Sequence, residues 1–391
     1  MSQHRIPAVY MRGGTSKGVF FLGRDLPQQP RDRDPLLLRV IGSPDPYAKH
    51  TDGMGGATSS TSKVVIITPS RRDDCDVDFL FGAVAIGDPL IDWSGNCGNL
   101  SAAVGPFAIS EGLVSANEGV TRVRIWQANL GRRIDAFVQV RNGEVLEEGA
   151  FMEDGVPFPC AEVRLEFLDP ADDAAGGSSA LLPTGALQDT LDVPRVGQVT
   201  ATMVTAGNPT VFVRAASIGL TGKESSADVD RDRKLLERLE AIRAVAAVRM
   251  GLAGSTEEAT RLRPGTPKIS WVGRPSAYRS SAGVDIAPDR IDVLARIMSM
   301  GRLHHAYTGT GSIALAVAAA LPGTVVNEVA RTLPGVPTRI GHQSGVLAVG
   351  AEVSRREDGA WHVDKAVLSR SARRLMSGWV YVPRAGLWTP A

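Results

Sequence analysis

Aromatic residues, cysteine and excess charge are all scarce in this chain of 391 residues. Its three cysteines, Cys75, Cys97 and Cys160, are too few, and odd in number, for a disulfide framework. The formal net charge is +1, so the overall electric field attracts neither nucleic acid nor an anionic membrane. We therefore expect no nucleic-acid partner, and an acidic ligand must be held by local donors.

Long apolar runs are missing as well. The longest one that the sequence offers, Ile313 to Leu321, is far too short to span a bilayer. Residues Met1 to Gly14 contain no apolar stretch of signal-peptide length. Together with the sparse cysteines, these absences predict a cytoplasmic protein without a membrane segment.

Several chemical signatures are also absent. The chain has no His-x-x-x-His, no Cys-x-x-Cys and no Asp-rich calcium loop, so we expect no metal. His304 and His305 are adjacent, and in regular structure they are expected to point in different directions. No Gly-x-Ser-x-Gly appears, and the glycines near Lys17 and Gly53 fit neither a Walker loop nor a dinucleotide fingerprint. We expect no cofactor, and the pattern assigns no role to His305 or His342.

Short β-like runs separated by glycine fill both halves of the chain. Period-two or apolar patterns predict strands at 8–11, 18–22, 63–67, 77–81, 122–126, 199–203, 210–213 and 268–272. One apolar stripe predicts an amphipathic helix over Arg233–Met250. Small apolar residues without alternation predict buried helices over Asn99–Ile109, bent or limited by Pro106, and over Gly309–Ala320.

The two buried helices resemble an internal repeat. Gly95–Val104 aligns with Thr308–Val317, about half a chain further on, which favours a duplicated domain over a chance likeness of two Gly/Ala-rich helices. The length of the chain also favours two domains. The polar segment Asp169–Thr184 is the expected linker. We predict lobes at 1–184 and 185–391, with the last residues free to pack back on the first lobe, and a ligand cleft between the lobes.

The starts of the two buried helices are candidate anion sites. Backbone N–H groups and the helix dipole favour a carboxylate or phosphate there. The simpler alternative is that Asn99 and Ser312 only cap their helices. Cys97 stands at the first of these turns, where a thiol ionises more readily and becomes a competent base or nucleophile.

Lys63 ends a long loop of glycines and hydroxyls that begins at Asp52 and leads straight into an apolar strand. Burial at the mouth of a strand favours the uncharged amine that a base requires. A solvated lysine at a strand end is the alternative. The donor row Ser60, Thr61 and Ser62 argues against it, because a fully exposed loop needs no such row.

Four sequence segments resemble motifs of a known protein family. They are Arg12-Gly-Gly-Thr-Ser-Lys-Gly18, Asp52-Gly-Met-Gly-Gly-Ala-Thr-Ser-Ser-Thr-Ser-Lys63, Asp92-Trp-Ser-Gly-Asn-Cys-Gly-Asn-Leu-Ser101 and Ile340-Gly-His-Gln-Ser-Gly345. With these segments the chain resembles the 2-methylaconitate cis-trans isomerase family of the diaminopimelate epimerase-like proteins, over nearly its whole length and through Ser369-Arg-Ser-Ala-Arg373. Gln343 stands where the family pattern has proline.

The resemblance implies an α+β fold of two pseudo-symmetric lobes, each a curved, barrel-like mixed sheet around a central helix. Epimerases of this superfamily use one cysteine from each lobe. Cys97 matches the first, whereas the second lobe offers Thr310 and Ser312 instead. The family's isomerase uses a lysine, and Lys63 stands at that position. We expect catalysis from Lys63 and Cys97, with Cys97 as the alternative base. The expected substrate contacts are Thr15, Ser16, Lys17, Ser60, Thr61, Ser62, Asn96, Gly98, Asn99, Lys268, Gly309, Thr310, Gly311 and Ser312.

The implied activity is conversion of 2-methyl-trans-aconitate, a small tricarboxylate, to its cis isomer in propionate breakdown through methylcitrate. Three alternatives stay open: a 3-methylitaconate isomerase, a 4-oxalomesaconate tautomerase, and a non-catalytic accessory protein. The last would support an iron–sulfur 2-methylcitrate dehydratase, which is also the expected functional partner. An oligomer is compatible with the sequence.

Overall fold

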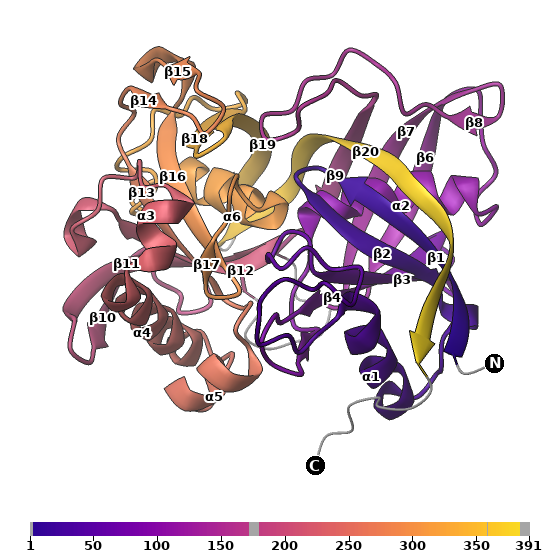
Figure 1. Ribbon diagram of the computed structural model, residues 1–391. Coiled ribbons are helices and arrows are strands. Elements are labelled where there is room, and N and C mark those ends of the chain that lie inside the picture. Colours follow the sequence, from indigo (N-terminus) through magenta and orange to yellow (C-terminus); the bar gives the residue numbers. More distant parts are fainter. Residues whose placement is uncertain (1–2, 172–179, 358, 384–391) are drawn as a thin grey trace. The chain divides into compact units, whose positions relative to one another are not determined.

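The structure is a computed structural model that describes residues 3–171, 180–357 and 359–383. The chain has a mixed α/β fold with extensive mixed sheet and few helices (Figure 1). It divides into two compact units. The first contains residues 1–152, 158–165 and 370–391, and the second contains 153–157 and 166–369. The domain boundary expected between residues 184 and 185 stays a prediction. Residues 172–179 of the expected linker lie outside the described ranges.

The first unit is built on one mixed sheet. Its strands pair in the order β20, β1, β2, β3, β4, β6, β7, with β2–β3 and β4–β6 parallel and the other pairs of this series antiparallel. The short strands β5 and β8 pair with β4 and β7. The elements are β1 (Gln3–Gly13), β2 (Ser16–Leu22), η1 (Gly23–Asp25), α1 (Pro30–Ile41), β3 (Lys63–Pro69), β4 (Val77–Val84), β5 (Ile91–Asp92), α2 (Gly98–Ser110), β6 (Gly119–Gln127), β7 (Arg132–Arg141), β8 (Glu144–Val145), β9 (Glu162–Leu168) and β20 (Trp361–Pro383).

The second unit repeats the theme with a different set of strands. Its sheet runs β10, β11, β12, β13, β16, β18, β19, and then the first part of β20. The elements are β10 (Asp189–Val193), β11 (Gly197–Ala206), β12 (Asn208–Arg214), η2 (Ala216–Ile218), α3 (Ser226–Arg231), α4 (Arg233–Arg249), α5 (Thr256–Leu262), β13 (Lys268–Gly273), β14 (Tyr278–Arg279), β15 (Asp285–Ile286), η3 (Pro288–Arg290), β16 (Val293–Ser299), β17 (Arg302–Leu303), α6 (Gly309–Ala320), β18 (Thr338–His342) and β19 (Gly345–Arg355).

Each unit contains one helix that is buried on nearly every side. In α2 every residue except Ser110 is buried, and in α6 every residue except Ala320. Glycine and alanine make this possible, because small side chains let strands approach the helix from several directions. Helix α2 contacts β1, β2, β6 and β7, and α6 contacts β11, β12, β18 and β19 (Figure 1). The two predicted helices are confirmed, and Pro106 does not end α2, which continues to Ser110.

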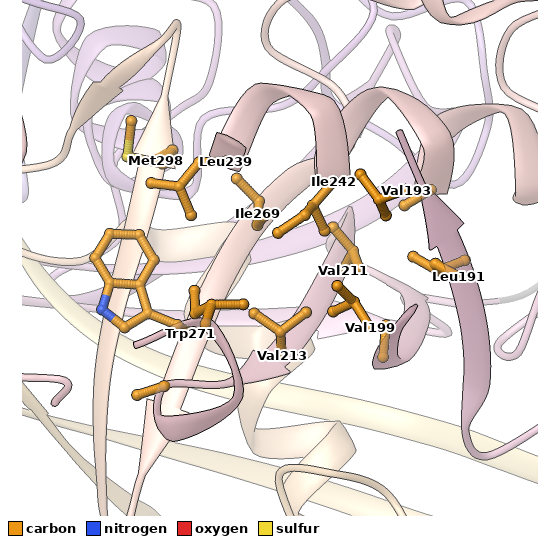
Figure 2. Packing of buried hydrophobic residues seen from close by; sticks show 14 of the residues in the cluster. Leu191, Val193, Val199, Val211, Val213, Leu239, Ile242, Ile269, Trp271 and Met298 are labelled. Atoms are coloured by element: carbon orange, nitrogen blue, oxygen red, sulfur yellow. The ribbon is translucent and has the colours of Figure 1, made fainter. Parts of the chain in front are cut away.

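Helix α4 has a different environment: one side packs on the sheet of its unit, and Ala244 and Ala247 on another side pack against Ala259 of α5. Leu239 and Ile242 on the side that faces the sheet pack against strand residues such as Val211, Val213 and Ile269 (Figure 2). Each large apolar side chain buried in this way contributes about 1.5–3 kcal/mol. The amphipathic helix predicted over Arg233–Met250 is therefore confirmed as α4. No helix in the described part of the chain combines the length and apolar character needed to cross a membrane.

Candidate active site

Lys63 is the first residue of β3, and its side chain is almost entirely inside the first unit. The residue is 6% exposed, and its backbone pairs with Ala83 of β4. Its Nζ lies 5.0 Å from the centre of the Phe81 ring. Among the described residues it makes no hydrogen bond or ion pair with a carboxylate. A buried lysine without an acidic partner is unusual.

Gly18 of β2 lies in close contact with Lys63. A Cβ at Gly18 would lie 2.9 Å from the Lys63 carbonyl oxygen and 3.1 Å from the Lys63 Cβ. The same Cβ would lie 3.1 Å from the Leu100 side chain at the start of α2. Only glycine permits this approach. Strands β2 and β3 and the beginning of α2 therefore converge around one point.

The β1–β2 turn is bonded directly to the start of α2. The Asn99 side-chain amide donates to the Thr15 hydroxyl at 3.0 Å and lies 3.4 Å from that of Ser16. Gly14 adopts φ +52°, and a Cβ there would lie 2.8 Å from the Asn99 Oδ1. That Oδ1 is buried and has no hydrogen-bond partner among the described residues. The structure thus brings three predicted contact residues together and leaves one acceptor unused.

Cys97 is the N-cap of α2, with Gly98 as the first helical residue. Its Sγ accepts from the Leu100 N–H at 3.5 Å, a long bond that suits sulfur, and the residue is 8% exposed. The first turn of the helix contains no charged side chain, so the positive end of its dipole is not neutralised there. By contrast, burial raises the pKa of Cys75 to about 11, which makes that thiol a poor nucleophile.

The hydroxyl loop before Lys63 is held by its own side chains. Thr58 Oγ1 lies 3.0 Å from Ser60 Oγ and 2.7 Å from Thr61 Oγ1. The Ser60 carbonyl accepts from the Lys17 N–H at 3.0 Å, which joins this loop to the β1–β2 turn. Ser62 Oγ lies 3.3 Å from the Nδ1 of His50. The loop is therefore fixed immediately before Lys63.

His50 is the buried anchor of that loop. The Ala57 N–H donates to its Nδ1 at 3.2 Å, so this nitrogen is the unprotonated one. Burial lowers the pKa of His50, and the Ile86 carbonyl and the Asp45 carboxylate offset this only in part. The neutral ring is thus the form that supports the loop.

In the second unit, α6 begins at Gly309 with Thr308 as its N-cap. The Ser312 hydroxyl donates to the Gly309 carbonyl at 2.6 Å, so it bonds within the first turn of the helix. A Cβ at Gly311 would lie 2.4 Å from the Thr308 hydroxyl, which explains the glycine. Thr310 is 1% exposed and lies close to Gly207, whose Cβ would be 3.1 Å from the Thr310 carbonyl oxygen.

Lys268 opens β13 beside Thr210 of β12. It is buried, and its ammonium donates to the Gly265 carbonyl at 2.8 Å in the loop just before the strand. Its environment therefore differs from that of Lys63, whose amine lies over an aromatic ring.

The histidines of the second unit are arranged differently from the expectation. The rings of His304 and His305 stack, with centroids 4.8 Å apart, instead of pointing apart, because this segment is a loop and not a regular element. His342 is buried, and its Nδ1 accepts from the Ser344 N–H at 3.2 Å. Within the described ranges, no group of three or more His, Cys, Asp or Glu side chains could hold a metal ion.

Gln343 has a structural partner. Its Oε1 accepts from the backbone N–H and the hydroxyl of Ser226, at 3.0 and 2.8 Å, at the start of α3. The side chain thus joins the β18–β19 turn to this short helix, a bond that proline cannot make.

Two polar residues near the start of α6 were missed by the sequence analysis. Asn208, at the start of β12, is 1% exposed, and its Oδ1 has no hydrogen-bond partner among the described residues. The Thr308 hydroxyl is buried and equally unpartnered within that set, although an N-cap threonine normally bonds its helix. Buried polar atoms are rarely left unpaired, so each of these two atoms has capacity for one further hydrogen bond. A single Asn or Thr gives no signal of this kind in a sequence.

Comparison with known proteins gives consistent matches over the whole chain. The model of the family described as PrpF protein matches residues 3–383. A 2-methyl-aconitate isomerase of Cupriavidus necator is 54% identical over 389 residues, covering 97% of this chain and 98% of that protein.

Solved structures agree. The crystal structure of a methylitaconate-delta-isomerase matches with a TM-score of 0.77 and 41% identity, covering 100% of this chain and 99% of the other. A hydroxyproline epimerase from Agrobacterium vitis matches with a TM-score of 0.56 at 15% identity, over 97% of this chain and 94% of the other. This second likeness concerns the fold alone, which is of the racemase and epimerase type.

Proposed function

We propose, on the premise that this chain belongs to the PrpF protein family, that it is an isomerase converting 2-methyl-trans-aconitate to 2-methyl-cis-aconitate without a cofactor. The observation that carries the proposal is Lys63: a lysine 6% exposed, without an acidic partner among the described residues, at the point where Gly18 and the start of α2 approach its strand closely. The similarity of the whole chain to a 2-methyl-aconitate isomerase supports the choice of substrate.

The reaction requires a carbon–carbon double bond to lose its double character for a moment. An uncharged Lys63 removes a proton from the CH2 carbon next to the double bond, and the electron pair of that C–H bond delocalises into a dienolate. Rotation follows, and the ammonium returns the proton to the same carbon. One base performs both transfers, so a second thiol is not required.

The negative charge of the dienolate spreads onto the substrate carboxylates, and donors that hold these groups stabilise it. In the first unit we assign this role to the start of α2 with Asn96, Gly98 and Asn99. The other donors there are Thr15, Ser16, Lys17, Ser60, Thr61 and Ser62. In the second unit the role falls to Lys268, Gly309, Thr310, Gly311 and Ser312, to which the unpaired Thr308 hydroxyl adds a donor.

This proposal includes the finer fold that the family implies: two pseudo-symmetric lobes, each with a barrel-like sheet around its buried helix. It also includes a cytoplasmic location and, as functional partner, an iron–sulfur 2-methylcitrate dehydratase. Burial of α2 and α6 by strands of their own units supports the first point.

A second activity is favoured by the match to methylitaconate-delta-isomerase. The analogous dienolate of methylitaconate, protonated at its other end, gives a shifted double bond instead of a rotated one. The two activities therefore share the base and the anion contacts, and differ in which carbon faces the ammonium. Cys97 as the base, with Lys63 binding a carboxylate, is the alternative assignment of roles.

The experiment is an assay of the purified protein against 2-methyl-trans-aconitate, 3-methylitaconate and 4-oxalomesaconate, followed by proton NMR. We expect the highest kcat/KM for 2-methyl-trans-aconitate, and the same value after exhaustive chelation. Preference for either other acid would reassign the substrate. Turnover of none of them would favour the accessory role, and loss on chelation that a divalent ion restores would contradict the cofactor-free mechanism.

A further inference from the structure

The Phe81 ring lies beside the Lys63 amine. Val65 pairs with Phe81 and Lys63 pairs with Ala83, so Phe81 is the diagonal neighbour of Lys63 on the same face of the sheet. The distance of 5.0 Å from Nζ to the ring centre is within the range of a cation–π contact.

The ring is held in place from behind. Phe81 is 4% exposed, and its backbone N–H donates to the Asn129 Oδ1 at 2.9 Å. The Asn129 amide donates in turn to the Phe81 carbonyl at 2.9 Å and to the Trp93 carbonyl at 2.7 Å. One side chain thus fixes the Phe81 backbone in both directions, and the ring has little freedom to move away from Lys63.

Other titratable groups stand on the elements around Lys63. They are Lys17 on β2, His50 in the preceding loop, Asp92 on β5 and Cys97 before α2. In the described part of the chain, none of them makes a hydrogen bond or ion pair with the Lys63 ammonium. The Asp92 carboxylate accepts from the N–H and the hydroxyl of Ser94, at 2.8 and 2.6 Å.

We propose that Phe81 is the positioning residue of Lys63: its ring holds the amine at the site and stabilises the ammonium that exists between the two proton transfers. The inference rests on the proposed function, since it takes Lys63 as the base. In the first transfer the C–H bond breaks and an N–H bond forms; in the second the reverse occurs, so no other reactant is needed.

An aromatic face suits this task better than a carboxylate does. A carboxylate beside Lys63 would keep it permanently charged and unable to accept a proton. The weaker attraction of a ring face lowers the cost of the buried ammonium and still lets the neutral amine form. The pairing thus accounts for a lysine that is buried without an acid.

The test keeps the shape of the ring and removes only its negative face. Phenylalanine analogues with one, two and three ring fluorines are introduced at position 81, and kcat/KM for the isomerisation is measured against pH. A weaker ring face makes the ammonium less stable, so the acidic limb should move to lower pH with each fluorine, by about one pH unit in total. The same analogues at Phe79, buried two residues earlier on β4, are the matched control and should leave the limb in place.

A second readout does not depend on activity. Cyanate carbamylates only the neutral amine, so the pH dependence of Lys63 labelling, read by peptide mass spectrometry without substrate, follows the same equilibrium. With the analogues at position 81, we expect the pH dependence of Lys63 labelling and the acidic limb of kcat/KM to move together. If neither moves, Phe81 is only a packing residue and the proposal is overturned. If labelling moves and kcat/KM does not, Lys63 is not the base, and the proposal falls with that assignment.

Discussion

The starts of α2 and α6 are built alike but equipped differently. Both are buried, both contain glycine in the first turn, and neither has a charged side chain there. At α2, the cap is a thiol that bonds its helix, and Gly18 joins the surroundings of this helix to those of Lys63. At α6, the cap is the hydroxyl of Thr308, which bonds nothing among the described residues, and the lysine of that unit is bonded to a carbonyl.

The difference teaches how a fold of the epimerase type can support a one-base reaction. Two-sided proton transfer needs a reactive group in each unit. Among the described residues, the first turn of α6 has hydroxyl and backbone groups, and Lys268 donates to the Gly265 carbonyl. We infer that the first unit performs the proton chemistry while the second binds charge. The following experiments test that division of roles.

The largest effect is expected from Lys63→Met against Lys268→Met. Loss of the base should lower kcat by about 10³-fold, a typical contribution of general-base catalysis. Loss of Lys268 should raise KM and lower kcat by no more than about tenfold, because its carboxylate contact binds the substrate and is only one of several donors that stabilise the dienolate. Steady-state kinetics on both variants decides, and equal losses of kcat would break the comparison.

Cys97→Ser is expected to have a smaller effect. The serine hydroxyl still accepts from the Leu100 N–H, so α2 keeps its cap, and turnover should fall by no more than about tenfold. Rates are compared with those of Lys63→Met at the same pH. If Cys97→Ser loses more activity than Lys63→Met, the role of base passes to Cys97.

Thr308→Val sharpens the comparison from the other side. The valine removes a buried hydroxyl that has no hydrogen-bond partner among the described residues, so the free energy of unfolding should rise by about 1 kcal/mol. If the hydroxyl binds substrate, KM should rise at the same time, by about tenfold. Urea unfolding and kinetics give the two numbers. A less stable variant with unchanged KM would show that Thr308 is an ordinary structural residue.

The smallest effect concerns His50. Its folded-state pKa lies below the ordinary value of 6.5, so the unfolded chain binds this proton more readily. The stability linked to the neutral ring is complete above pH 6.5 and is lost as the pH falls through the folded-state pKa. His50→Gln should therefore lose less unfolding free energy between pH 6.5 and about 5 than the unchanged chain. Parallel slopes in urea titrations would contradict this.

The sequence predicted those parts of the fold that have a regular apolar pattern. The strands at Lys63 and Val77 and the helices α2, α4 and α6 are confirmed, because burial on fixed faces leaves a period in the sequence. Helix α1 was not predicted, because Pro35 lies inside it and its first half is charged. Strand β20 was not predicted either, because charged residues such as Lys365 and Arg374 interrupt its apolar positions.

Some residues of the candidate site could be predicted from the sequence, and others could not. Loops rich in glycine and hydroxyls drew attention to Lys63, Cys97 and Asn99, and the structure joins their segments through Gly18 and Thr15. Phe81, Asn208 and Thr308 gave no such signal. Their importance arises from distance and from unpaired buried atoms, which depend on how distant segments fold together.

Hydrogen exchange during turnover tests the central claim most directly. If Lys63 removes a proton from the CH2 carbon and returns it, the ammonium holds three equivalent hydrons, and the label scrambles even in a closed site. In D2O, the account predicts deuterium at that carbon in the cis product and, to a lesser extent, in recovered substrate. Addition of Cys97 to the double bond, with rotation and elimination, requires no exchange there. Product formed in D2O without deuterium at the CH2 carbon would contradict proton transfer as the mechanism.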